Sequence, residues 1–358
     1  MKCDIIIPVW NQLEATKECI DSILKNTNTP FRFVIIDNGS DLKTSSFLDA
    51  LASVPHLDIK VLRNSANLGF VKAANQGLAA SDSPYICLMN NDTIATSGWL
   101  EEMLSVLDSK EDIGIVNPSS NTSGQFPPKG LVIESFALSL KSLKGQVQEL
   151  NVARGFCMLM KRAVLEKVGL FDEDYNIGYF EETDFSKRAQ EAGFTIVRAK
   201  ASYVYHKEGI SFKELDRRES LFKANESIYF RKWGRRVRAA YLAEDLSFGA
   251  KVDKIAAAVA RDGHQMLILT KKGVEWPITI DHFDVRKQEV ACAPFALGSF
   301  LQLLKRRRKK AIEVVLTDNP LIGNFLKALS FLHGAKVAIN PEKDSVLNML
   351  RRLSRKPK

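Results

Sequence analysis

Polar side chains able to bind metal ions or transfer protons follow segments of this sequence that have the pattern of β-strands. Asp37 follows "FVII", and Asn90, Asn91 and Asp92 end the segment "YICLMNND". Mg²⁺ and Mn²⁺ prefer oxygen ligands and typically bind one or two carboxylates together with substrate phosphates. A divalent ion on a diphosphate neutralises the charge that grows as the diphosphate leaves. These residue types therefore suit group transfer from a nucleotide diphosphate.

Further carboxylates lie in the segment "YFEETDF", where Glu181, Glu182 and Asp184 fall close together. A carboxylate here could deprotonate an attacking hydroxyl group. The same acids could instead stabilise the N-terminus of a helix through its dipole, and Asp37 could simply cap a loop. Both interpretations stay open on the residue types alone.

Four familiar catalytic motifs are absent from the sequence. No GxGxxG follows the first predicted strand, and there is no GxxxxGK[ST] segment, GxSxG elbow or HExxH pair. The chain therefore lacks the usual phosphate cradles of dinucleotide-dependent and P-loop enzymes and the signatures of serine hydrolases and zinc proteases. A sugar nucleotidyltransferase would need a Gly-rich loop with Arg and Lys after the first strand, and "PVWNQLE" has none.

The polar residues must be positioned by strands and helices that alternate from residue 3 to about residue 120. The segments "CDIIIPVW", "FRFVIIDNGS", "LDIKVLRN" and "YICLMNND" have the pattern of strands, and helical patterns separate them. This alternation predicts an α/β fold with a mostly parallel central sheet flanked by helices. Ligands of such sheets bind beyond the carboxyl ends of the strands. We therefore expect the polar strand ends to share one crevice.

The length of 358 residues suits one large domain and one smaller domain. The sequence has a helical and basic pattern from Ile210 to about Tyr241, and a second strand and helix pattern begins near residue 248. We expect a first domain over residues 1–242 and a small α/β domain with three parallel strands over residues 243–358. The cysteines are five in number without a CxxC pair, which indicates buried free thiols in a reducing compartment.

Residues 3–230 resemble the inverting GT-A glycosyltransferases of family 2, in the branch that includes rhamnosyltransferases. The resemblance implies a GT-A nucleotide-diphospho-sugar transferase fold and metal-dependent, inverting transfer of a hexosyl or rhamnosyl group. Seven motifs carry it, in family order: "DIIIPVWN", "VIIDNGSD", "NLGFVKAANQG", "LMNNDT", "GFCMLMKR", "FDEDYNIGYFEETDFSKRAQEAGF" and "HKEGIS".

The resemblance also implies which residues hold the donor. Asp37 matches the carboxylate that contacts the nucleotide base, and "NND" matches the DxD element, with Asn90 in place of its first Asp. Asp92 is its metal-contacting residue, and His206 matches a histidine that completes the site for Mn²⁺ or Mg²⁺. The full nucleotide-sugar set implied in this way is Pro8, Val9, Asp37, Asn67, Gly69, Lys72, Asn90 and Asn91.

The acidic motif "EET" matches the segment that supplies the catalytic base in the family. Glu182 aligns with the base, Glu181 precedes it and Asp184 follows it, while the family more often has Asp at the Glu182 position. Gly155 would allow an acceptor to approach the backbone closely. The resemblance implies a dTDP- or UDP-linked sugar donor and a glycan or lipid-linked acceptor in cell-surface polysaccharide synthesis. The alternative is a non-catalytic GT-A-like protein that binds a nucleotide sugar or acts as a scaffold.

The segment "AIEVVLTDNPLIGNFLKALSFLHGAKVAIN" is similar to part of the N-terminal half of GT-B glycosyltransferases. It predicts a partial GT-B-like or docking module, and we assign it no catalytic residues.

The net charge of +9 is concentrated in "RKWGRRVR", "KRRRKK" and "RRLSRKPK". Such clusters suit anionic partners, and we expect a cytoplasmic protein with peripheral contact to an anionic inner membrane face. The alternative is an ordinary solvated basic surface. We expect no nucleic-acid partner, because neither interleaved aromatic residues nor a nucleic-acid-binding motif accompanies the charge.

Overall fold

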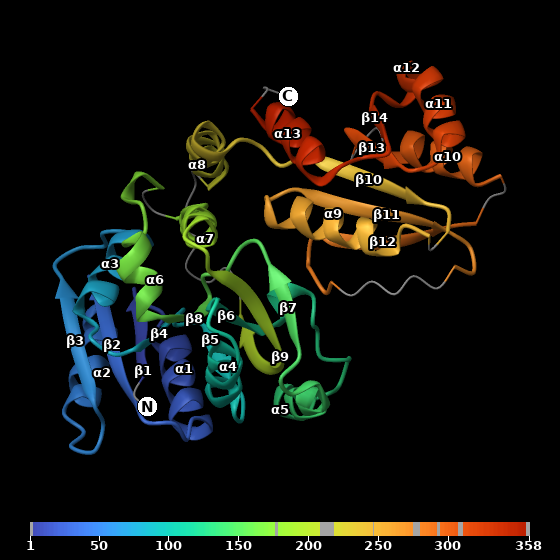
Figure 1. Cartoon of the computed structure of the whole chain (residues 1–358). Coiled ribbons are helices and arrows are strands. Elements are labelled where there is room, and N and C mark those ends of the chain that lie inside the picture. The colour runs from blue at the N-terminus through green and yellow to red at the C-terminus, as the bar shows by residue number, and fades with distance from the viewer. Residues whose placement is uncertain are drawn as a thin grey trace. The chain divides into compact units, whose positions relative to one another are not determined.

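Figure 1 shows the computed structural model of the chain. The structure describes residues 3–175, 178–207, 218–245, 247–274, 280–291, 294–306 and 311–355. The chain divides into two compact units, Met1–Ile228 and Tyr229–Lys358. The division falls within the helix α8 (Arg218–Trp233), earlier than the expected boundary at residues 242 and 243.

The first unit is built on one nine-stranded sheet. Its strands lie in the order β3-β2-β1-β4-β8-β6-β9-β5, and β7 pairs with β9. The strands β1 to β4 are parallel, whereas β8 runs antiparallel to both of its neighbours, β4 and β6. The strands are β1 (Cys3–Val9), β2 (Phe31–Asn38), β3 (Ile59–Asn64), β4 (Tyr85–Met89), β5 (Thr93–Ala95), β6 (Ile113–Ser119), β7 (Val147–Leu150), β8 (Cys157–Lys161) and β9 (Thr195–His206).

Helices cover both faces of this sheet, which confirms the expected α/β class (Figure 1). Neighbouring residues of β1 point to opposite faces, as strand geometry requires. Ile5 and Ile7 lie in a buried cluster with side chains of α1, α2 and α4, and Ile6 lies in a second cluster with side chains of α3, α6 and α7. The helices of this unit, besides α8, are α1 (Leu13–Asn26), α2 (Leu42–Ala52), α3 (Phe70–Ala80), α4 (Trp99–Asp108), α5 (Ile133–Ser139), α6 (Arg162–Val168) and α7 (Glu181–Glu191).

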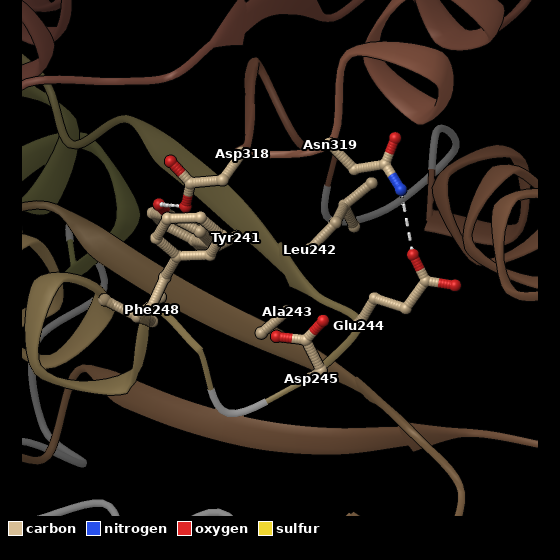
Figure 2. Close-up of a pocket in the computed structure, with 9 residues that line it drawn as sticks. Tyr241, Leu242, Ala243, Glu244, Asp245, Phe248, Asp318 and Asn319 are labelled. Carbon is tan, nitrogen blue, oxygen red and sulfur yellow. Dashed lines mark hydrogen bonds between the residues drawn. The ribbon is translucent and has the colours of Figure 1, made fainter.

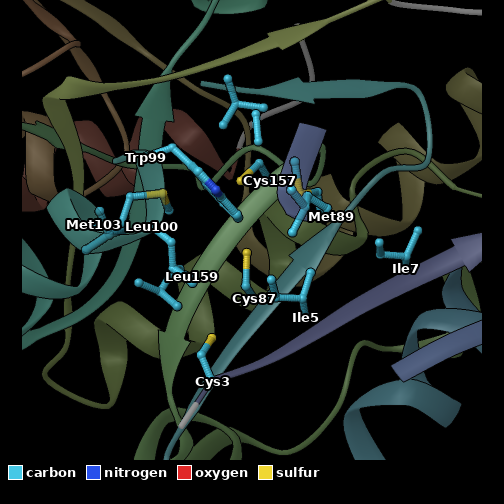
Figure 3. Close-up of a cluster of buried hydrophobic side chains, with 14 of the residues drawn as sticks. Cys3, Ile5, Ile7, Cys87, Met89, Trp99, Leu100, Met103, Cys157 and Leu159 are labelled. Atoms are coloured by element: carbon cyan, nitrogen blue, oxygen red, sulfur yellow. The ribbon is translucent and has the colours of Figure 1, made fainter. Parts of the chain in front are cut away.

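The first cluster contains cysteine side chains among its aliphatic residues (Figure 3). Cys3, Cys19, Cys87 and Cys157 are free and buried, which confirms the interpretation of these four as buried thiols. Burial raises the pKa of Cys19 to about 12, so this thiol stays protonated at neutral pH. Cys292 lies outside the described residues.

The second unit has a sheet of five parallel strands in the order β12-β11-β10-β13-β14. Its strands are β10 (Arg238–Ala243), β11 (Gln265–Lys271), β12 (Val285–Val290), β13 (Val314–Thr317) and β14 (Lys336–Ile339). The helices α9 and α13 pack on one face, and α10 and α11 pack on the other. Its helices are α9 (Gly249–Arg261), α10 (Phe295–Arg306), α11 (Pro320–Ala328), α12 (Ser330–His333) and α13 (Lys343–Ser354).

Two expectations about this region are wrong. The sheet has five strands, not three, and the helical pattern expected up to Tyr241 ends at Trp233. Gly234, with a φ of 79°, follows the helix in the left-handed conformation that commonly ends helices. The next apolar run is then buried as the central strand β10, so the expected boundary at residue 242 falls inside the second sheet.

No helix among the described residues is both long enough and apolar enough to span a membrane.

Candidate active site

The first group of predicted site residues lies where β1 and β2 end. The parallel register places Val9 beside Asp37 and Pro8 beside Ile36, so the two strand ends are adjacent. Asp37 is only 3% exposed. Its two oxygens accept separate hydrogen bonds, one from the backbone N–H of Ser40 at 3.0 Å and one from the guanidinium of Arg63 at 2.7 Å. The carboxylate is therefore held in one orientation at the sheet edge.

Asn67 and Gly69 are tied to the same edge through Asn38. The Asn38 amide nitrogen donates to Asn67 Oδ1 at 2.8 Å, and Asn67 Oδ1 also accepts from the N–H of Gly69 at 2.9 Å. Asn38 Oδ1 accepts from Asn64 Nδ2 and from the N–H of Leu68. This network fixes the loop that leads into α3. The sequence pattern already places Asn38 with Asp37 at this strand end, but it assigns Asn38 no binding role.

Lys72 is exposed on the first turn of α3. It lies three residues after Gly69, which has a φ of 87° and precedes the helix. The structure therefore places Asp37, Asn67, Gly69 and Lys72 along connected segments at one edge of the sheet.

Gly39 lets this loop approach closely. Its φ is +75°, and a Cβ at this position would lie 2.6 Å from the backbone carbon of Ala66. A non-glycine residue in the left-handed conformation costs roughly 1–2 kcal/mol. We expect Gly39→Ala to lower the free energy of unfolding of the first unit by more than this, because the backbone at Ala66 must also shift. Gly155→Ala is the matched control, since nothing lies within 4 Å of its Cβ. Urea unfolding of both variants measures the difference, and equal stability would contradict the close approach.

The predicted DxD-like element forms a turn between β4 and β5. The N–H of Asn90 donates to the carbonyl of Phe156 at 2.9 Å, and the carbonyl of Asn90 accepts from Thr93 Oγ1 at 2.8 Å. Asn91 is 6% exposed, and its amide nitrogen donates to Thr16 of α1 at 2.9 Å. Asn91 thus holds the turn against α1.

Asp92 and His206 come together although 114 positions separate them in the sequence. The antiparallel pairing of β5 with β9 places His206 opposite Thr93. Asp92 Oδ1 lies 3.1 Å from His206 Nε2, which is also 3.4 Å from Asn90 Nδ2. The imidazole stacks on Phe156, with ring centroids 5.2 Å apart and an interplanar angle of 14°.

This pair fits part of a divalent-cation site. The separation of Asp92 Oδ1 and His206 Nε2 matches the distance of about 3 Å between adjacent ligands of an octahedral ion with bonds of ~2.1 Å. His206 Nδ1 is buried and makes no hydrogen bond to any described residue. No group of three or more His, Cys, Asp and Glu residues within the described part of the chain could hold a metal. The two residues would therefore need substrate phosphates to complete a coordination shell.

The acidic pair Glu181 and Glu182 begins α7. Burial raises the pKa of both carboxyls, and the charge of Glu182 raises that of Glu181 further. A hydrogen bond between the two side chains raises the pKa of Glu181 and lowers that of Glu182. Arg154 also lowers the pKa of Glu182. Burial therefore disfavours a negative charge on either carboxyl, and the nearby charge of Arg154 offsets part of that effect at Glu182.

Glu182 has a carboxylate oxygen that is prepared to accept a hydrogen bond. Its Oε2 atom is buried without a hydrogen-bond partner among the described residues, as is Oε2 of Glu181. A buried acceptor without a donor is unfavourable by about 1–3 kcal/mol. A substrate hydroxyl would supply that donor.

Asp184 is placed differently from the other two acids. It is fully buried, with 0% exposure, and accepts from Arg188 Nε at 2.7 Å. The hydroxyl of Tyr175 lies 3.5 Å from its other oxygen. Arg188 also donates to the carbonyl of Leu170 at 2.9 Å. Asp184 therefore belongs to an internal ion pair that ties α7 to the chain after α6.

The segment from Arg154 to Phe156 connects the acidic pair with the Asp92 and His206 pair. Arg154 acts on the charge of Glu182, and Phe156 contacts both the Asn90 turn and His206. Between them lies Gly155, with open space on its Cβ side. The sequence analysis missed Arg154 and Phe156, whose roles depend on partners far away in the chain.

Comparisons with known proteins identify the family to which part of this chain is similar. Residues 4–169 match the family model described as Glycosyl transferase family 2. An uncharacterized glycosyltransferase of Haemophilus influenzae is 29% identical over 109 residues, which cover 30% of this chain and 33% of the relative. The uncharacterized glycosyltransferase YwdF of Bacillus subtilis is 25% identical over 193 residues, which cover 53% of this chain and 68% of the relative.

Among solved structures, the mannosyltransferase PcManGT from Pyrobaculum calidifontis, in complex with GDP-Man and Mn²⁺, is 18% identical with a TM-score of 0.49 and 64% coverage of each chain. The chain thus spans about a third of the first relative's length and about two thirds of the second's. The family match and the helix-flanked sheet agree with the expected GT-A fold class. Residues 4–169 of the first unit are therefore similar to glycosyl transferase family 2.

Proposed function

We propose that the protein is an inverting glycosyltransferase that moves a hexosyl or rhamnosyl group from a nucleotide-diphosphate sugar to a hydroxyl acceptor. The observation that carries this proposal is the buried acidic pair, in which Glu182 Oε2 has no partner among the described residues, linked by residues 154–156 to Asp92 and His206. The family 2 match over residues 4–169 supports the reaction class.

In this mechanism the first group of residues binds the donor. Asp37, oriented by Arg63, would accept a hydrogen bond from the nucleotide base above Pro8 and Val9. Lys72 would add a positive charge near the diphosphate, where an exposed ammonium suits phosphate oxygens. We propose a dTDP- or UDP-linked donor on the basis of the resemblance given above.

Asp92 and His206 would hold Mn²⁺ or Mg²⁺ together with the donor diphosphate. When bound, the ion supplies charge neutralisation for the leaving diphosphate. Asn90 contributes no charge, so the DxD-like element offers a single carboxylate, Asp92, to the ion.

Glu182 would act as the catalytic base. Its unpartnered Oε2 would accept the proton of the acceptor hydroxyl while that oxygen attacks the anomeric carbon. The bond from the anomeric carbon to the diphosphate breaks on the opposite face, so the configuration inverts. Glu181 would orient Glu182 through their hydrogen bond.

The proposal predicts nucleotide-specific, metal-dependent stabilisation. We expect UDP or dTDP with Mn²⁺ to raise the melting temperature by a few degrees, because a ligand at 100 times its Kd adds about 2.7 kcal/mol. GDP and ADP should have smaller effects, and Asp92→Ala should abolish the metal-dependent part. Glu14→Gln is the control, since Glu14 is exposed and, within the described ranges, forms an ion pair with Lys17 alone. Absence of stabilisation by all four nucleotides would contradict a donor site.

A non-catalytic protein that binds a nucleotide sugar is the second candidate. The specific observation that favours it is Asn90, which replaces a carboxylate in the DxD-like element and leaves Asp92 as its only acid. Such a protein would bind a nucleotide with Mn²⁺ and show no turnover. Turnover that depends on Glu182 separates the two candidates.

We also propose a glycan or lipid-linked acceptor and peripheral contact with an anionic membrane. Part of the basic segment 231–238 is engaged internally, because Arg235 pairs with Glu313 at 2.6 Å and Arg236 pairs with Asp284 at 3.1 Å. The last turn of α8 contains Arg231 and Lys232, and Lys232 Nζ lies 5.5 Å from the ring centroid of Trp233. Residues 307–310 and 356–358, which hold much of the other basic clusters, lie outside the described residues.

The membrane proposal predicts salt-sensitive binding to anionic liposomes. Each cation near an anionic surface contributes about 1 kcal/mol, and this attraction is screened by salt. We expect sedimentation with phosphatidylglycerol liposomes at low salt and release at high salt, with phosphatidylcholine liposomes as the control. Binding that is absent, or indifferent to salt, would contradict the proposal.

A further inference from the structure

The second unit has the strand order of a doubly wound α/β sheet. In chain order its five strands lie as 3-2-1-4-5, because β10 is central between β11 and β13. After β10 the chain passes to α9 on one face of the sheet, and after β13 it passes to α11 on the other. Adjacent parallel strands whose connections leave to opposite faces form a switch point, and such sheets bind ligands at that point, beyond the carboxyl ends of the strands.

A pocket lies at this switch point (Figure 2). Its volume is about 190 Å³, which is below the ~300 Å³ of most small-molecule sites and therefore suits a group the size of a single ring. Residues from the end of β10 form one part of the wall, and residues from the end of β13 form another. The lining residues are Tyr241, Leu242, Ala243, Glu244, Asp245, Phe248, Val252, Asp318 and Asn319.

The pocket wall presents fixed carboxylates. Asp318 accepts from the hydroxyl of Tyr241 at 2.5 Å and from Lys251 Nζ at 2.7 Å, and its side chain is 6% exposed. Glu244 accepts from Asn319 Nδ2 at 2.9 Å. A carboxylate offers about four acceptor positions, so both acids keep unused acceptor capacity while their orientation is set by the protein.

A third carboxylate and an aromatic ring complete the pocket. Asp245 accepts from the N–H of Ser247 at 2.8 Å, which fixes it in the turn after β10. Phe248 is 48% exposed, and Lys251 Nζ lies 5.9 Å from its ring centroid. The pocket therefore combines hydrogen-bond acceptors with an exposed aromatic ring.

This charge pattern disfavours a phosphate ligand. Glu244, Asp245 and Asp318 bring three negative charges, and Lys251, already paired with Asp318, brings one positive charge near them. The turn after β10 reads "EDLSFG", without the glycine-rich sequence that cradles a pyrophosphate in dinucleotide-binding sheets. The ligand chemistry that fits is a neutral ring with many hydroxyl donors and an apolar face.

We propose that this pocket binds one sugar ring of a glycan. Sugar hydroxyls would donate charge-assisted hydrogen bonds to Glu244, Asp245 and Asp318, and the apolar face of the ring would lie against Phe248. The choice of a glycan among polyhydroxylated ligands rests on the proposed glycosyltransferase function. The second unit would then contribute to holding the acceptor glycan, separately from the donor residues of the first unit.

Saturation-transfer NMR on the full chain tests the proposal, with glucose, galactose, mannose, rhamnose and N-acetylglucosamine as probes. We expect at least one sugar to bind, and Phe248→Ala and Glu244→Gln each to weaken that binding about tenfold, the effect of losing a charge-assisted hydrogen bond or a comparable aromatic contact. Asp344→Asn, an exposed acid of α13, is the matched control and should bind like the wild type. Circular dichroism verifies that each variant is folded. If Phe248→Ala does not fold, Glu244→Gln alone still tests the proposal.

Three results would overturn the proposal. The first is that none of the five sugars binds, in which case these groups only join β10, β13 and α9. The second is that Phe248→Ala and Glu244→Gln bind as the wild type does. The third is that binding is lost in Asp92→Ala instead, which would place the sugar in the first unit. Nucleotides could fail to stabilise the wild type while sugar binding persists in Asp92→Ala. That result would contradict the proposed transferase and support this sugar site, so failure of the proposed function can be distinguished from failure of this proposal.

Discussion

Replacing Glu182 by Gln is expected to lower kcat by about 10²–10⁴-fold, the usual contribution of a general base. Glutamine preserves the shape of the side chain but cannot accept the acceptor's proton. Donor binding should be unchanged, because Glu182 lies in the acidic pair with Glu181 and Arg154 and not among the residues around Asp37. Steady-state turnover of a nucleotide sugar and the thermal shift with nucleotide and Mn²⁺ measure the two quantities on the same samples.

Glu181→Gln is the matched comparison for this variant. The amide can still donate a hydrogen bond to Glu182, so we expect a smaller loss of kcat than in Glu182→Gln. The assignment of the base would be overturned if Glu181→Gln lost more activity than Glu182→Gln. Loss of nucleotide stabilisation in Glu182→Gln would instead show that the residue binds the donor.

The acidic pair also predicts how activity depends on pH. Burial raises the pKa of Glu182 above its ordinary value, and the base is active only when ionised. Activity should therefore rise as the pH rises through that elevated pKa and then level off. Arg154 lowers the pKa of Glu182, so Arg154→Met should move the rising limb to higher pH. A limb that stays in place in the variant would contradict the electrostatic role of Arg154.

Raising the pH is expected to increase activity but to decrease the stability that this acidic pair contributes. The folded state holds a proton on Glu181 at pH values where an unfolded glutamate has lost it, so the folded state binds more protons. The free energy of unfolding contributed by this group therefore falls as the pH rises from the ordinary glutamate pKa to the elevated one. Glu181→Gln removes this titration and should flatten that fall, which urea unfolding at several pH values would measure.

Arg188→Met is expected to destabilise the first unit by about 3–5 kcal/mol, the usual cost of leaving a buried charge without its partner. Asp184 has no exposed surface, and Arg188 Nε donates to it at 2.7 Å. Methionine removes the guanidinium and its hydrogen bond to the Leu170 carbonyl, while it fills a similar volume. Urea unfolding, followed by tryptophan fluorescence, measures the change.

Asp184→Asn distinguishes a structural acid from a catalytic one. We expect it to retain most of kcat while losing stability, because the carboxylate orients α7 and does not receive the substrate proton. The double variant Arg188→Met, Asp184→Asn has no buried charge left unpaired. Its loss in the free energy of unfolding should therefore be smaller than the sum of the losses in the two single variants. A loss of kcat in folded Asp184→Asn as large as that in Glu182→Gln would return Asp184 to the list of bases.

Much of the candidate site follows from local sequence patterns. Strands that end in Asp37 and in the "NND" segment are recognisable because apolar runs and turn residues are adjacent in the chain. The parallel alternation of strands and helices then brings their carboxyl ends together, as Val9 beside Asp37 shows. The acidic segment at the start of α7 is visible in the same way.

Other features depend on partners distant in sequence. Asp184 is paired with Arg188, and the side chain of Asn91 donates to Thr16 of α1. His206 contacts Asp92, which lies 114 positions earlier in the sequence. No local pattern gives these contacts, because they arise only when the sheet brings separate segments together. The sequence analysis extended the helix through the basic residues after Trp233 for a similar reason. Arg235 and Arg236 pair with Glu313 and Asp284, which lie far away in the sequence, and these pairs allow arginines to precede a buried strand.

The sequence by itself determined the α/β class and the set of polar residues at the ends of the first strands, since both depend on periodicity and on residue types within short segments. Only the tertiary structure decided that the pKa values of Glu181 and Glu182 are raised and that a pocket lies at the ends of β10 and β13. The Glu181 and Glu182 pKa values depend on burial and on Arg154, and the pocket beside Asp318 requires β10 and β13 to be neighbours. Desolvation and long-range pairing are properties of the packed chain, and neither is present in any segment before it folds.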